Sequence, residues 1–389
     1  MTGKPLKIML VAAEASGDAL GAGLAAALRG RLGDGVTFVG VGGPRMAEQG
    51  IESPFDIADL SILGWLEGLK AYGLVKRRVA DTVAQAGRER PDAVVLIDSW
   101  GFTIRVARAL RQALPDAALI KYVGPQVWAS RPGRAKTLAA TVDHLLALYA
   151  FDAPWFEREG LPTTVVGSQA LHTDMSGADP DGFRRARGIA PDADLLLVLP
   201  GSRPSEIRLM TPVYEAAVRQ LKAATPDLEV AVVLAGTVAD DVAARVAAWP
   251  FRTHLVTEAD KHSAMRAATV ALATSGTVST ELAIAGAPMI IGYRFQPLSY
   301  AIMKPFFTGK YATLFNHAAD AEIARELVQK DATPENVAHE VRRLLNDPAA
   351  RKAQAERQTA ALAMMGRGPR DPSDVAAEAV LKVIAERKS

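Results

Sequence analysis

Short, almost wholly apolar runs alternate along this chain with segments of helical periodicity, and this alternation limits the fold more than any other feature. Residues 6–12, 93–97 and 119–123 are such runs, and polar or glycine-containing turns follow them. A run without polar alternation is typical of a strand buried on both faces of a sheet. Residues 103–113 instead repeat apolar side chains at helical spacing, which predicts an amphipathic helix. Strand, loop and helix in this order predict a parallel sheet with helices on both faces.

The same pattern begins again in the second half of the chain. Residues 171–192 are polar, rich in glycine and proline, and lack a sustained apolar period, which predicts a linker between domains. The runs 195–199, 230–235 and 269–274 predict the strands of a second parallel sheet. We therefore expect an α/β protein of two Rossmann-like lobes, each with a parallel sheet, and a ligand cleft between the lobes.

The length of 389 residues fits two domains at roughly 150 residues per domain. We expect the first domain over residues 1–170 and the second over residues 171–345. Residues 346–389 are expected to form C-terminal helices that pack back toward the first domain.

Composition excludes several classes of function. The 45 basic and 43 acidic side chains leave a net charge of +2, which argues against a nucleic-acid partner bound through bulk charge. The absence of cysteine excludes a thiolate nucleophile and a cysteine-ligated metal, and no two of the six histidines have the helical spacing of a metal site. No apolar run approaches the ~20 residues that a membrane-spanning helix needs. We expect a cytoplasmic chain.

Two turns in the second half have the composition of phosphate sites. In an open parallel sheet, ligands bind beyond the carboxyl ends of the strands. Gly201, Ser202 and Arg203 follow one predicted strand and offer backbone N–H groups, a hydroxyl and a guanidinium. The run 275–277 (Ser275, Gly276, Thr277) follows another, with Glu281 one helical turn later to accept the hydroxyls of a ribose. A nucleoside diphosphate is the simplest ligand, although a surface turn and a solvated glutamate would have the same sequences.

Polar residues also follow two predicted strands of the first half. Asp98 ends an apolar strand and is placed to act as a general base toward a substrate hydroxyl, or to cap the helix that follows. Glu14, Ser16, Gly17 and Asp18 form a polar cluster after the first strand, and they too could cap a helix. These residues are the candidates for chemistry in the first domain.

Two segments combine apolar and cationic side chains. Residues 62–79 place Trp65, Leu66 and other large apolar side chains beside three consecutive cations, and residues 302–311 pair two phenylalanines with two lysines. This combination suits contact with an anionic lipid surface, and ordinary buried helix faces would explain it equally well.

Taken in order, the motifs resemble those of the lipid-A-disaccharide synthases, a family of inverting GT-B glycosyltransferases. The resemblance covers roughly residues 5–345. It is carried by the runs 14–18, 40–44, 97–98, 122–128, 200–206, 275–281, 293–298 and 316–327.

The resemblance implies a reaction without a metal or other cofactor. Family members join UDP-2,3-diacylglucosamine to 2,3-diacylglucosamine 1-phosphate (lipid X), with the acceptor on the first domain and the UDP-sugar on the second. Asp98 then matches the general base, with Glu14 beside it in the catalytic site. The residues that match the UDP-sugar site are Ser202, Arg203, Glu206, Ser275, Gly276, Thr277, Glu281 and Asn316.

The resemblance also implies where the protein works. Both substrates carry acyl chains, so we expect a peripheral protein on the anionic cytoplasmic face of the inner membrane, with a homodimer as a possible assembly. Lipid X, the UDP-sugar and this membrane surface are the expected partners.

The sequence departs from the family pattern at two places. Ser168 and Gln169 stand where the family has His or Asn and then Pro, and residues 319–322 lack a Gly and an Arg that the family shows. These departures leave a non-catalytic UDP-sugar or lipid-binding homologue as an alternative. Another two-domain UDP-sugar enzyme, such as an undecaprenyl-linked N-acetylglucosaminyl transferase or a UDP-N-acetylglucosamine 2-epimerase, is a further alternative that the run 14–18 argues against.

Overall fold

The computed structural model describes residues 4–61, 68–274, 276–296 and 309–388 and divides into two compact units. Unit 1 comprises Met1–Ser168 and Gly368–Ser389, and unit 2 comprises Gln169–Arg367. The helices expected over residues 346–389 are thus divided: α16 (Pro348–Met364) lies in unit 2 and α17 (Pro372–Lys388) in unit 1. None of the helices in the described part of the chain has both the length and the apolar character needed to cross a membrane.

Unit 1 is built on a six-stranded sheet in which all neighbouring strands are parallel. In sheet order its strands are β2 (Val36–Val41), β1 (Leu6–Ala12), β3 (Ala93–Ile97), β4 (Ala118–Tyr122), β5 (His144–Ala147) and β6 (Thr163–Val165). The apolar runs that predict strands at residues 6–12 and 93–97 are therefore confirmed. Every residue of β3 and β4 is buried, as expected for strands covered on both faces.

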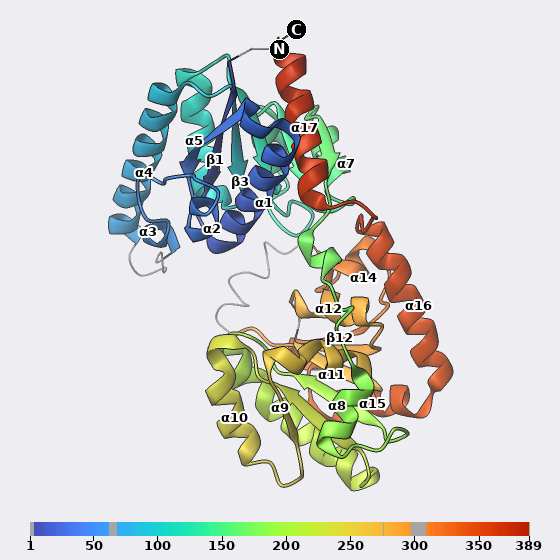
Figure 1. Cartoon of the computed structure of the whole chain (residues 1–389). Coiled ribbons are helices and arrows are strands. Elements are labelled where there is room, and N and C mark those ends of the chain that lie inside the picture. The colour runs from blue at the N-terminus through green and yellow to red at the C-terminus, as the bar shows by residue number, and fades with distance from the viewer. Residues whose placement is uncertain (1–3, 62–67, 275, 297–308, 389) are drawn as a thin grey trace. The chain divides into compact units, whose positions relative to one another are not determined.

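Helices cover both faces of this sheet (Figure 1). Ile8 and Leu10 face one core, which α1 (Ala15–Leu32) and α17 complete, and these two helices from opposite ends of the chain lie side by side. Met9 and Val11 face the other core, with α4 (Gly68–Glu89) and α5 (Trp100–Ala113). The shorter helices of the unit are α2 (Pro44–Ala47), α3 (Ala58–Ser61), α6 (Arg134–Ala139) and α7 (Ala153–Glu157).

Unit 2 repeats the plan with a second parallel six-stranded sheet, so the predicted α/β class with two parallel sheets is confirmed. In sheet order its strands are β12 (Arg325–Val328), β11 (Met289–Tyr293), β10 (Val270–Thr274), β7 (Leu195–Leu199), β8 (Glu229–Val233) and β9 (His254–Val256). Its other helices are α8 (Pro180–Arg187), α9 (Pro204–Ala224), α10 (Ala239–Ala247), α11 (Lys261–Ala267), α12 (Val278–Ala285), α14 (Leu314–Ala318) and α15 (Pro334–Asn346).

The predicted linker over residues 171–192 is wrong in its middle part, which forms α8. The Asp179 carboxylate accepts the Gly182 N–H at 2.8 Å and caps this helix, and Pro180 suits its first turn. Phe183 is buried by the helix, and the Arg187 guanidinium lies 4.0 Å from the centre of the Phe183 ring. A single large, buried apolar side chain in eight residues gives no apolar period that can be recognised in the sequence, but it is enough to anchor the helix.

Strands β1 and β2 approach so closely at Gly40 that only a glycine fits there. Its φ is +152°, and a Cβ at this position would lie 1.9 Å from the Leu10 carbonyl oxygen of β1. We expect Gly40→Ala to lower the free energy of unfolding by about 2 kcal/mol or more, because the strand backbone itself must move. Gly30→Ala in α1 is the matched control: nothing lies within 4 Å of the added Cβ, so it should stabilise by about 0.5–1 kcal/mol. Urea unfolding of the two variants measures both effects, and equal free energies of unfolding would contradict the close approach of β1 and β2 at Gly40.

Candidate functional site

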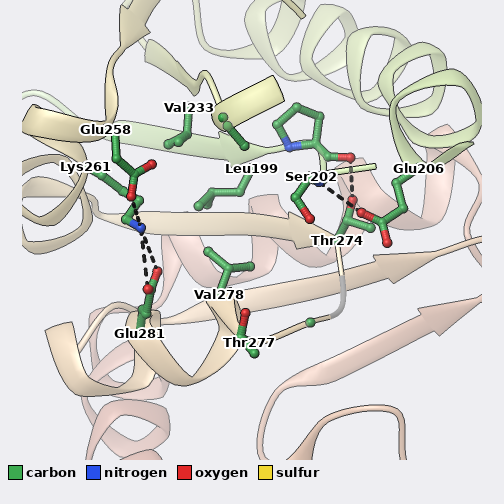
Figure 2. A pocket seen from close by; sticks show the side chains of 15 residues that line it. Leu199, Ser202, Glu206, Val233, Glu258, Lys261, Thr274, Thr277, Val278 and Glu281 are labelled. Carbon is green, nitrogen blue, oxygen red and sulfur yellow. Dashed lines mark hydrogen bonds and ion pairs between the residues drawn. The ribbon is translucent and has the colours of Figure 1, made fainter. Parts of the chain in front are cut away.

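A pocket of about 280 Å³ lies in unit 2, beyond the carboxyl ends of three neighbouring strands (Figure 2). Leu199, Val233 and Thr274 are the last residues of β7, β8 and β10, and all three line it. Both predicted phosphate turns border the same cavity. The predicted site residues that line it are Gly201, Ser202, Glu206, Gly276, Thr277 and Glu281. Ser275 lies outside the described residues.

The first turn is held by a buried carboxylate. Glu206 is only 5% exposed, and its Oε2 accepts the backbone N–H groups of Ser202 at 3.0 Å and Arg203 at 3.3 Å. Gly201 has a φ of +126°, and a Cβ there would meet the Glu206 side chain at 2.6 Å. The Glu206 carboxylate therefore holds the backbone of this turn. The Arg203 side chain is 74% exposed, with its Nη1 3.3 Å from Glu206 Oε1.

Buried hydroxyls tie the strand ends together beneath the pocket. Thr274 Oγ1 donates to the Pro200 carbonyl at 2.9 Å and lies 3.1 Å from the Tyr214 hydroxyl. Tyr214 in turn donates to the Gly292 carbonyl at 3.2 Å, and burial raises the pKa of its phenol. These contacts join β7, β10, β11 and α9, so the floor of the pocket is preorganised.

One lysine lies between two acidic side chains on the pocket wall (Figure 2). Lys261 Nζ is 3.2 Å from Glu281 Oε2 and 2.5 Å from Glu258 Oε1. Burial opposes the charge on Lys261, but hydrogen bonds and charges from Glu258 and Glu281 together outweigh it and raise its pKa. The lysine therefore stays cationic and orients Glu281 at the edge of the pocket. Lys261 and Glu258 were not expected from the sequence: Lys261 lies 20 residues from Glu281, and the local pair of Glu258 with Lys261 does not by itself indicate a site.

Asn316 does not line the described pocket. It is fully buried, and its amide oxygen accepts the backbone N–H groups of Ile323 and Ala324 at 2.8 and 3.1 Å. Its amide nitrogen donates to the Ala324 carbonyl and to Glu326 Oε1, both at 2.8 Å. All four hydrogen-bonding positions of the side chain are thus used inside the protein, where they fold the segment before β12.

In unit 1, Asp98 lies directly beyond β3 and is half-buried. Ser16 at the start of α1 donates its hydroxyl to Asp98 Oδ2 at 3.3 Å, and the Glu14 side chain at the N-terminal cap of α1 is exposed. Gly17 lets α1 approach the sheet, since a Cβ there would lie 3.2 Å from the Ala12 Cβ. The structure thus brings Asp98 and Ser16 together at this edge.

Asp18 turns away from this group and builds a loop. It is 3% exposed, and its carboxylate accepts three backbone N–H groups, from Gly43, Arg45 and Met46, at 2.7 to 3.0 Å. The side chain therefore links α1 to the start of α2 and fixes the turn after β2.

Two buried ionisable groups at the same edge of unit 1 were missed from the sequence. Lys121 is 2% exposed within the otherwise apolar strand β4. Asp152, beyond β5, is 7% exposed and accepts the indole N–H of Trp128 at 3.0 Å. Burial raises the pKa of Asp152 to about 7, although the hydrogen bond from Trp128 opposes this shift. A charged residue inside an apolar run was the signal for Lys121; for Asp152 the sequence offers none.

The two apolar and basic segments are described only in part. Residues 62–67 and 302–308 lie outside the described residues, so their role at a lipid surface stays a prediction. In the described ranges, no group of three or more histidine, aspartate or glutamate side chains is placed to hold a metal ion.

The chain matches the family model described as lipid-A-disaccharide synthetase over residues 8–380. It is 46% identical over 385 residues to the lipid-A-disaccharide synthase of Rhodospirillum centenum, covering 99% of this chain and 96% of that protein. The corresponding enzyme of Paramagnetospirillum magneticum is 41% identical over 383 residues, with 98% of each chain covered.

Solved structures share the fold at low sequence identity. The UDP-GlcNAc 2-epimerase from Neisseria meningitidis bound to UDP-GlcNAc gives a TM-score of 0.58 at 11% identity, over 98% of this chain and 100% of that one. CalG4, the calicheamicin glycosyltransferase, gives a TM-score of 0.58 at 16% identity, over 98% of this chain and 99% of that one. At such identities the likeness shows the fold alone, which is the GT-B architecture.

The buried carboxyl of Asp152 predicts a pH-dependent term in stability. Because its pKa in the folded protein is about 7, against an ordinary value of 3.8, its contribution is fully present below the ordinary value and is lost as pH rises through about 7. Asp152→Asn keeps an acceptor for the Trp128 indole and should show a smaller loss of stability than the parent protein between pH ~5 and ~8. Thermal unfolding across this range measures the difference. Asp34→Asn, at an exposed site, is the control. If the stability of Asp152→Asn changed with pH in the same way as that of the parent protein, the raised pKa of Asp152 would be ruled out as the cause.

Proposed function

Because the chain belongs to the lipid-A-disaccharide synthase family, we propose that it joins UDP-2,3-diacylglucosamine to 2,3-diacylglucosamine 1-phosphate. The products are the β-1,6-linked disaccharide 1-phosphate and UDP. The structural observation that carries this proposal is the pocket of unit 2, where both phosphate-type turns and the acid Glu281 line one cavity.

The pocket supports binding of the UDP part of the donor. The turn at Ser202 offers a hydroxyl, and the exposed Arg203 offers a cation for the diphosphate. As the bond to the sugar breaks, negative charge develops on the leaving UDP, and the guanidinium stabilises it. Glu281, oriented by Lys261, accepts the ribose hydroxyls.

Asp98 supports the acceptor half of the reaction. Its carboxylate takes the proton from the 6-hydroxyl of the acceptor while that oxygen attacks the anomeric carbon of the donor. The bond from the anomeric carbon to UDP breaks on the opposite face, and UDP leaves with the electron pair, which inverts the configuration. Ser16 donates to one carboxylate oxygen of Asp98, and Glu14 is the N-terminal cap residue of the same helix.

Both substrates carry acyl chains, and this supports a peripheral contact with the anionic cytoplasmic surface of the inner membrane. The segments 62–79 and 302–311 are the proposed contact. Binding to vesicles that contain anionic lipid tests this part. A homodimer stays a prediction from the resemblance.

Incubation of the purified protein with both substrates tests the reaction. Formation of the tetra-acyl disaccharide phosphate supports it, whereas UDP binding without turnover supports the non-catalytic alternative. That alternative rests on the departures from the family pattern at residues 168–169 and 319–322.

We expect Asp98→Asn to lower kcat by about 10²–10⁴-fold, the usual contribution of a general base. The affinity for UDP should not change, because the nucleotide pocket is lined entirely by residues of unit 2. Steady-state kinetics and UDP titration calorimetry measure the two quantities, with Asp34→Asn as the control. A near-normal rate would remove Asp98 from the base role.

Arg203→Ala should weaken donor binding by about 1.5–3 kcal/mol, the scale of one charged hydrogen bond. The donor KM should rise and kcat should fall together, because the cation acts on both bound and departing diphosphate. Arg203 caps α9 next to the pocket residue Ser202, although it does not itself line the pocket; Arg219→Ala, farther along α9 and likewise paired with a glutamate, is the matched control. Unaltered kinetics in Arg203→Ala would count against a diphosphate at this turn.

A further inference from the structure

The backbone at Asp98 is held in a conformation that its residues disfavour. Asp98 has a φ of +48° and Ser99 a φ of +39°, both in the left-handed region. For residues other than glycine this region costs about 1–2 kcal/mol each, so neighbouring contacts must hold the turn. This turn decides where the carboxylate of Asp98 points.

Those contacts converge on the Asp98 peptide from β4 and α5. The Asp98 N–H donates to the Tyr122 carbonyl at 2.9 Å, which continues the pairing of β3 with β4. The Asp98 carbonyl accepts the ammonium of Lys121 and, at 2.8 Å, the hydroxyl of Thr103. Lys121 Nζ also donates to Thr103 Oγ1 at 3.0 Å, and this oxygen lies 3.1 Å from the Ser99 carbonyl.

Lys121 is a costly residue for its place in the sheet. Its register neighbours are Leu96 on β3 and Leu145 on β5, and the side of the sheet that these leucines face is apolar. Burial lowers the pKa of Lys121 to about 7, and the charges of Asp98 and Glu14 act in the opposite direction. An apolar side chain would pack there without this desolvation cost. The observed partners of the ammonium therefore point to a role in the adjacent site.

We infer that Lys121 is the positioning residue for Asp98: with Thr103 it holds the Asp98 carbonyl, fixes the left-handed turn, and places a positive charge behind the carboxylate. The inference rests on the proposed role of Asp98 as the general base. Thr103, on α5, accepts a hydrogen bond from Lys121 and donates one to the Asp98 carbonyl. Glu14 and Asp98 are the acidic groups whose charges act on Lys121. Lys121 itself does not touch the substrate in this scheme.

Lys121→Met is the first test, because methionine fills a similar volume without the charge or the donor. A base displaced by about 1 Å costs about 100-fold in rate, so kcat should fall about 10–100-fold. The donor KM and the affinity for UDP should stay within about twofold, because unit 2 is untouched. Loss of a nearby positive charge disfavours the ionised carboxylate, so the acidic limb of the pH profile of kcat should move to higher pH.

A Thr103 pair keeps the test decisive if Lys121→Met does not fold. Thr103→Val removes the hydroxyl at nearly constant shape and should lower kcat about as much as Lys121→Met does. Thr103→Ser retains the hydroxyl and should keep kcat near that of the parent protein. Thr82→Val is the matched control in the same unit: Thr82 is also fully buried and donates to a carbonyl of its own helix, that of Arg78, at 2.7 Å. It should leave kcat unchanged.

The outcomes separate this inference from the proposed function. If Asp98→Asn keeps its rate, the base role itself fails. If Asp98→Asn is inactive while Lys121→Met and Thr103→Val keep kcat within about threefold and an unshifted acidic limb, the positioning role alone fails. If Thr103→Ser loses as much activity as Thr103→Val, the role of the Thr103 hydroxyl in holding the Asp98 carbonyl is likewise overturned.

Discussion

Strands that are buried on both faces accept few polar side chains, and the rest of the structure depends on this constraint. In β3 and β7 every side chain is buried and apolar, so the polar groups near these two strands, such as Asp98 and Ser202, lie beyond the strand ends. All neighbouring strands are parallel, and their carboxyl ends therefore gather at one edge of each sheet. The pocket of unit 2 and the group around Asp98 in unit 1 are two results of the same rule.

Buried acceptors hold the turns and loops that precede or follow the strands. Asp18 binds three backbone N–H groups after β2, Glu206 binds two after β7, and Asn316 binds two before β12. Each of these side chains satisfies donors that a tight turn would otherwise bury without partners. Motif residues of this kind hold the backbone of turns and loops, which is a different role from touching a ligand.

The sequence was sufficient for the architecture and only partly sufficient for the site. Apolar runs located the strands at residues 6–12 and 195–199, because burial on both faces leaves a signal within five to seven neighbouring residues. The same reasoning read α8 as linker, since its helix is anchored by Phe183 alone. Composition at the strand ends identified Ser202, Thr277 and Glu281 as neighbours of a cavity. It could not distinguish a carboxylate that faces a cavity from one that folds its own loop, such as Asp18, because the two differ only in side-chain direction.

Lys261 in unit 2 and Lys121 in unit 1 both lie near carboxylates at a sheet edge, and the different depth of burial shifts their pKa values in opposite directions. Lys261 keeps contacts with two carboxylates that outweigh its desolvation, so its pKa is raised and its charge is fixed at neutral pH. Lys121 is more deeply buried, its direct partners are a carbonyl and a hydroxyl, and its pKa falls to about 7. The cation beside Glu281 is therefore a permanent part of the pocket wall. Burial instead lowers the pKa of Lys121, behind Asp98, to about 7, so the positive charge at this place depends on pH in the neutral range.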